Sequence, residues 1–70
     1  MAWKLKRDKV ELFAMNKGMT IKDIQTAAVL SQATMYKAMH GGKASVKTIG
    51  KIALALEVDA AEIAENVPDE

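Results

Sequence analysis

Apolar residues recur along this chain at the spacing of α-helices. Ile49, Ile52, Ala53 and Leu56 lie at i, i+3, i+4 and i+7, which places them on one face of a helix. No stretch alternates apolar and polar residues over the length of a strand. The pattern therefore predicts an all-α fold, a compact five-helix domain. The expected helices cover approximately 8–17, 20–29, 31–40, 45–56 and 59–67.

Capping residues mark the ends of these helices. Thr20 and Asp23 have the T-x-x-D form of a capping box, and Ser31 and Gly41 suit the two ends of the third helix. The final residues, 67–70, are expected to fray. Gly18 should end the first helix, Ser45 and Asp59 should cap the fourth and fifth, and Val10, Leu12 and Phe13 should face inward.

The composition describes one small domain, 1–70, whose core must be aliphatic, because half of the residues are hydrophobic but only three are aromatic. The chain has no cysteine, which excludes disulfides and thiolate metal sites. No apolar run approaches the ~20 residues of a membrane span, and the start MAWKLKRDK lacks the apolar core of a signal peptide. We therefore expect a soluble cytoplasmic protein with no membrane association.

The net charge of +1 conceals a strong polarity. Residues 1–51 hold ten basic and three acidic side chains, a formal charge of +7, whereas residues 52–70 hold six acids and no base. A basic side of this kind fits a polyanion, although two solvated surfaces would give the same pattern.

The helix over 31–40 has a polar face without any acid. Its inward face is expected to consist of Met35, Ala38 and Met39. The opposite face carries Gln32, Ala33, Tyr36, Lys37 and His40. This face either meets a partner or is merely solvated.

Catalysis is not expected, and neither a metal nor a cofactor is implied. The only histidine, His40, has no evident metal partner and suits the C-terminal end of the helix dipole. The sequence GGK lacks the spacing of a phosphate-binding loop.

Two short helices joined by a tight turn indicate a helix-turn-helix over about 20–40. Apolar residues occur where the packing of the two helices requires them: Ile24, Ala28, Leu30, Met35 and Ala38.

The segments KGMTIKDI, LSQATMYKAMHGGK and VKTIGKIALALEVDAAEI together resemble the lambda-repressor-like helix-turn-helix family, also called Cro/CI or Xre. The resemblance runs from Lys17 to about Ile63. It implies a lambda-repressor-like fold and a transcriptional regulator that binds double-stranded DNA with helix 32–40 in the major groove. The regulator is expected to be a repressor from a bacterium, phage or mobile element.

The resemblance also implies site residues. Base contacts would come from Gln32, Ala33, Tyr36 and Lys37. Phosphate contacts would come from Thr20, Ile21, Lys22, Thr34, His40, Lys43 and Lys47.

Some positions depart from the family pattern. Gln25 stands where relatives usually carry Ala or Gly, and Ala14 and Met39 replace a common Arg–Glu pair together. Val29 replaces the usual turn glycine. A β-branched residue in the left-handed region costs on the order of 1–2 kcal/mol, which leaves the geometry of this turn open.

A homodimer is expected, since one subunit has one reading helix. Ile63 and Val67 could form an apolar seam between subunits, whereas Trp3 could either cover the small core or meet a partner. The alternative function is a protein-interaction module that sequesters a toxin or another regulator.

Overall fold

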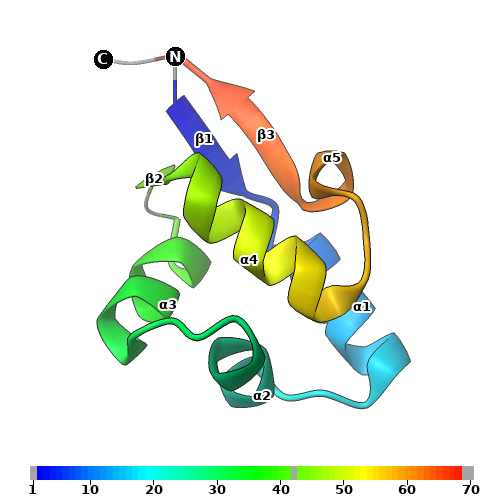
Figure 1. Cartoon of the computed structure of the whole chain (residues 1–70). Helices are drawn as coiled ribbons and strands as arrows, with labels where there is room; N and C mark the ends of the chain where they lie inside the picture. The colour runs from blue at the N-terminus through cyan, green and yellow to red at the C-terminus, as the bar shows by residue number, and fades with distance from the viewer. Residues whose placement is uncertain (1, 42, 69–70) are drawn as a thin grey trace.

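The computed structural model describes residues 2–41 and 43–68, which form five helices and three short strands (Figure 1). The elements follow one another as β1 (Ala2–Leu5), α1 (Arg7–Lys17), α2 (Ile21–Ala27), α3 (Gln32–Met39), β2 (Lys43–Ala44), α4 (Val46–Leu56), α5 (Ala60–Ile63) and β3 (Ala64–Val67). In Figure 1 the sheet lies at one end of the molecule and α2 at the other.

Side-chain caps start three of the helices as predicted. The Thr20 hydroxyl accepts from the Asp23 N–H at 3.1 Å, and the Asp23 carboxylate accepts from the Thr20 N–H at 2.9 Å, which completes the capping box. Ser31 and Ser45 accept in the same way from N–H groups three residues later. Asp59 occupies the N-cap position of α5, but its side chain makes no capping hydrogen bond.

The prediction of five helices is confirmed, but the prediction of a purely α-helical chain is wrong, because residues near both ends of the chain form strands. Antiparallel β1 pairs with β2 on one side and with β3 on the other, in the order β2-β1-β3. The expected long fifth helix stops at Ile63, and Ala64 is already extended (φ −124°, ψ 147°). The Ile63 carbonyl instead accepts from the Lys6 N–H at 2.7 Å, which joins the end of α5 to the end of β1.

Val67 is the last residue of β3. It faces Ala2 across the sheet, and Pro68 follows the strand rather than a helix. Of the expected frayed segment, residues 69–70 lie outside the described residues.

One aliphatic core joins all five helices to β1 and β3. Of the predicted inward residues of α1, Val10 is buried and Phe13 packs partly against the core, but Leu12 is exposed. Ile63 is fully buried, so it cannot form a seam between subunits. The buried residues are Leu5, Val10, Ala14, Ile24, Ala28, Met35, Ala38, Met39, Ile49, Ile52, Ala53, Leu56, Ile63 and Ala64.

The family departures on α1 and α3 are accommodated by this core. Ala14 and Met39, which replace a charged pair of relatives, are both buried among apolar side chains. No ion therefore has to lose its hydration at these positions.

The turn between α2 and α3 takes the left-handed form despite its valine. Val29 has φ 55°, and its N–H donates to the Thr26 carbonyl while the Leu30 N–H donates to the Gln25 carbonyl. These two hydrogen bonds form a Schellman motif. The same motif ends α1, where Gly18 occupies the position that corresponds to Val29. Gly usually occupies such a position because a Cβ atom strains it.

We expect Val29→Gly to raise the free energy of unfolding by about 1 kcal/mol, because the removal of strain from the folded state outweighs the extra freedom that glycine gives the unfolded chain. The Val29 side chain is 80% exposed, so little burial is lost. Urea denaturation followed by circular dichroism measures the change. Val29→Ala removes most of the same side chain but keeps Cβ, and should gain less. A glycine variant no more stable than the alanine variant would contradict this account.

Candidate nucleic-acid interface

Helix α3 is fixed in the core by one face and exposed along the other. Met35, Ala38 and Met39 are buried, which sets the rotation of the helix about its own axis. The opposite face exposes the five residues expected there: Gln32, Ala33, Tyr36, Lys37 and His40. Because these residues include no carboxylate, the exposed face is neutral or positive along its whole length.

A groove of about 330 Å³ separates α3 from α2. Met35 and Met39 lie in it beside Gln25, the residue that replaces the small one of relatives. Since the longer Gln side chain lines this groove, it belongs to the same surface as the exposed residues of α3. The groove also brings together several predicted contacts, namely Ile21, Lys22, Gln32, Tyr36 and His40.

Tyr36 and His40 stack on each other along α3. Their ring centroids are 3.9 Å apart and the ring planes differ by 20°. The i, i+4 spacing of two flat side chains brings them to the same side of a helix. The His40 ring therefore stacks on the ring of Tyr36, a predicted base-reading residue. This role of His40 was not predicted from the sequence.

A second surface hollow, of about 200 Å³, gathers other predicted residues. Thr34 and Lys37 of α3 line it together with Lys43 of β2 and Thr48 of α4. Thr48 was not predicted, and its hydroxyl accepts from the Ser45 hydroxyl at 3.0 Å. Lys47, in the first turn of α4, is exposed but does not line either hollow.

The start of α2 offers less to an anion than the sequence suggested. The capping box already uses the Thr20 N–H and the Asp23 N–H, and it adds a carboxylate at this helix end. Thr20 and Lys22 are exposed and Ile21 is half-buried. Lys22 is thus the stronger of the phosphate candidates here.

The unexpected sheet brings two further charges to the end of α3. Lys4 of β1 and Glu65 of β3 line a surface hollow together with His40. This arrangement could not be predicted from the sequence, because both residues lie in strands that its pattern does not indicate. Arg7 and Asp8 line the same hollow, so the surface around His40 carries charges of both signs.

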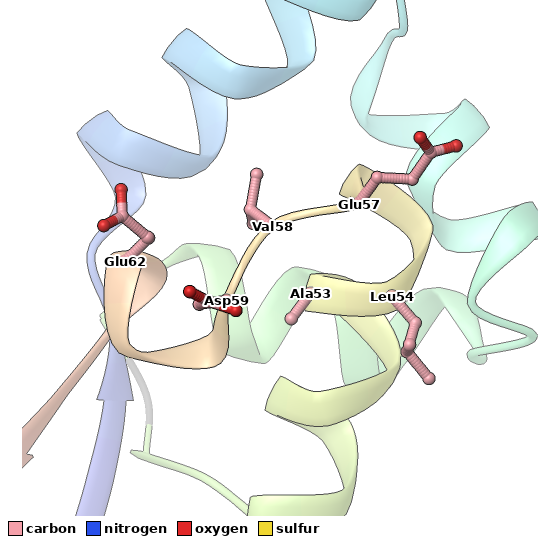
Figure 2. Close-up of a pocket in the computed structure, with 6 residues that line it drawn as sticks. All are labelled: Ala53, Leu54, Glu57, Val58, Asp59 and Glu62. Atoms are coloured by element: carbon pink, nitrogen blue, oxygen red, sulfur yellow. The ribbon is translucent and has the colours of Figure 1, made fainter.

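Three of the four acidic residues that the structure describes in 52–68 lie on another side of the molecule. Figure 2 shows Glu57, Asp59 and Glu62 around a pocket where α4 joins α5. In Figure 1, α3 and α5 lie on opposite sides of α4. Glu57 also pairs with Lys17 at 3.2 Å. These carboxylates therefore do not oppose an anion placed along α3.

Two features are absent from the part of the chain that the structure describes. Residues 2–41 and 43–68 contain no cluster of three or more His, Asp or Glu side chains that could hold a metal ion. Within the same residues there is no helix both long and apolar enough to cross a membrane.

Comparison with known proteins agrees with this arrangement. The chain matches the Cro/C1-type HTH DNA-binding domain family over residues 5–69, and it belongs to that family. This match confirms the resemblance drawn from the sequence segments.

A solved structure supports the fold independently. The protein is similar to the transcriptional regulator VanUg in its crystal structure, with a TM-score of 0.78 and 19% sequence identity. The similarity covers 99% of this chain and 92% of that one. Among curated proteins, a sequence search gave no significant match.

Proposed function

We propose that the protein is a transcriptional regulator, a repressor, that binds specific sequences of double-stranded DNA with α3 in the major groove. The carrying observation is the acid-free face of α3, whose opposite face Met35, Ala38 and Met39 hold in the core. Family membership and the likeness to a regulator support the same proposal. A bound domain blocks other proteins from its site, so repression requires no further activity.

The residues at the exposed front of α3 have the chemistry to read bases. A Gln amide can bond an adenine in two places, a Lys can donate to guanine, and an Ala methyl can contact a thymine methyl. Gln32, Lys37 and Ala33 supply these groups on one exposed surface. Tyr36, held by the stack with His40, adds an aromatic ring and a hydroxyl.

The surrounding residues are proposed to hold phosphates. Lys22 lies beside the α2–α3 groove, Lys43 lines the hollow next to Lys37, and Lys47 is exposed at the start of α4. The hydroxyls of Thr20 and Thr34, the backbone N–H of Ile21 and the side chain of His40 complete the proposed set. Phosphate contacts orient a protein on DNA without reading its sequence.

We expect DNA affinity to fall steeply as salt concentration rises. If about 4–6 phosphates are neutralised per subunit, log K should fall with log salt at a slope near −4 to −5. Fluorescence anisotropy with a duplex selected from a random pool measures the slope. Binding that does not respond to salt, or no binding to any duplex in the pool, would remove DNA as the target.

Gln32→Ala and Lys37→Ala should each lose about 1–3 kcal/mol on the selected site and relax preference at particular base pairs. Lys43→Ala and Lys47→Ala are the matched controls. Each should weaken all duplexes alike and flatten the salt slope by about one. Titrations on selected and scrambled duplexes separate the two classes, after circular dichroism has shown that each variant is folded.

An unchanged ratio of selected to scrambled affinity in both Gln32→Ala and Lys37→Ala would mean that α3 does not read DNA. A protein-interaction module that uses the same face would then be the better hypothesis.

The proposed regulator acts as a homodimer on a pseudo-palindrome, because one subunit offers a single reading helix. The two half-sites should lie ~34 Å apart or a multiple of that. Sequencing of the selected duplexes reveals the repeat, and sedimentation gives the number of subunits per duplex. A site without an inverted repeat, bound by one subunit, would exclude the dimer on DNA.

A further inference from the structure

Gly50 lies in the middle of α4, where nothing inside the subunit requires a glycine. A Cβ atom added there would meet no other atom within 4 Å, and Gly50 is not among the residues with positive φ. A glycine in a helix interior destabilises the helix relative to alanine. The usual structural reason for accepting this cost is a close approach by another backbone.

Exposed apolar residues continue on both sides of Gly50. Val46 and Leu54 lie one turn before and one turn after it, and they are 69% and 80% exposed. We call Val46, Gly50 and Leu54 the α4 row. Contiguous apolar surface of this kind marks interaction sites on small proteins.

An apolar groove of about 420 Å³ lies beside Val46 and Gly50 of the α4 row, and Leu54 lines the next pocket along α4. Trp3, which was expected from the sequence either at the core or at a partner, lines this groove and is 38% exposed. The small side chains of Ala60, Ala61 and Ala64 form its other wall. The surface is therefore apolar and open to a partner of matching shape.

Opposite charges flank the α4 row on its two sides. Lys47 and Lys51 follow Val46 and Gly50 by one residue, and thus lie 100° further round the helix, away from the groove. Asp59 and Glu62 lie on the other side, where α5 packs against α4 (Figure 2). A two-fold axis along the row would place the basic flank of one copy against the acidic flank of another.

We propose that the α4 row and its groove bind a second copy of this chain, with Gly50 at the closest approach of the two helices. This charge arrangement favours a second copy, because a two-fold contact must be complementary to itself. The inference supplies a surface for the proposed dimer, in place of the buried Ile63, and so rests in part on the proposed function. The contact itself does not require DNA.

The first test is Gly50→Ala, studied by sedimentation equilibrium without DNA. The added methyl should raise the dimer dissociation constant about tenfold or more by overpacking the contact. The same change should raise the thermal midpoint of the diluted monomer, because alanine is the better helix former. Stability and association therefore move in opposite directions, which separates a broken contact from misfolding.

Leu54→Ala should also weaken the dimer, whereas Met15→Ala should leave it unchanged. Met15 is the matched control, since it is a similarly large and exposed apolar residue on α1. Equal effects of the two changes would overturn the proposal, as would a wild-type chain that remains monomeric at millimolar concentration.

The second test exchanges charges across the contact. Lys51→Glu alone and Glu62→Lys alone should each weaken self-association roughly three- to tenfold, because each puts like charges opposite one another. An equimolar mixture of the two variants should recover mixed dimers of wild-type affinity. Failure of the mixture to recover while both single variants are folded would overturn the two-fold arrangement.

The DNA measurements keep the two proposals distinguishable. If the wild-type chain is a monomer in solution and still binds its selected duplex, this inference is overturned and the proposed DNA binding stands. A dimer weakened by Gly50→Ala that binds no duplex would support the inference and overturn the proposed function.

Discussion

Burial of three side chains of α3 is the constraint on which the rest of the molecule depends. Met35, Ala38 and Met39 enter a core formed by the other helices and two strands, and this leaves only one face of α3 for a partner. Rotation of the helix by a quarter turn would expose a methionine and bury a polar group without a partner, which is unfavourable on both counts. The orientation of the candidate reading residues is thus a consequence of packing.

The small sheet adds a second constraint on the same helix. β2 follows α3 after a short connection and pairs with β1, so that Ala44 faces Trp3. The segment that leaves α3 is therefore tied to the strand that also holds β3. β1 therefore contacts both surfaces, the candidate DNA face and the groove beside α4, although they lie on different sides of the molecule. It pairs with the segment that follows α3, and its Trp3 lines the groove beside α4.

The helices and their caps were readable from the sequence because each depends on local rules. Thr20, Ser31 and Ser45 start helices wherever a hydroxyl can accept from an N–H three residues on, and the apolar spacing of α4 identified its buried face. The strands were not readable. Each is at most four residues long, and the sheet stabilises them through hydrogen bonds to partners far away in the chain. The geometry of the turn at Val29 could not be predicted for a related reason, because tertiary packing decides whether the local strain is tolerated. The individual DNA contacts remain predictions.

The pairing of β1 with β3 also has a consequence for the order of folding. Ala2 faces Val67, so this part of the sheet joins residues from almost the full length of the chain. Such contacts form late, because a large loop must close before any hydrogen bond compensates for the lost entropy. On a ribosome, the helices from α1 to α4 emerge before β3 exists. Until then β1 has an unpaired edge, and the carbonyl of Ile63 is not yet there to accept from Lys6. The final alignment of the sheet is thereby postponed until synthesis has passed Val67.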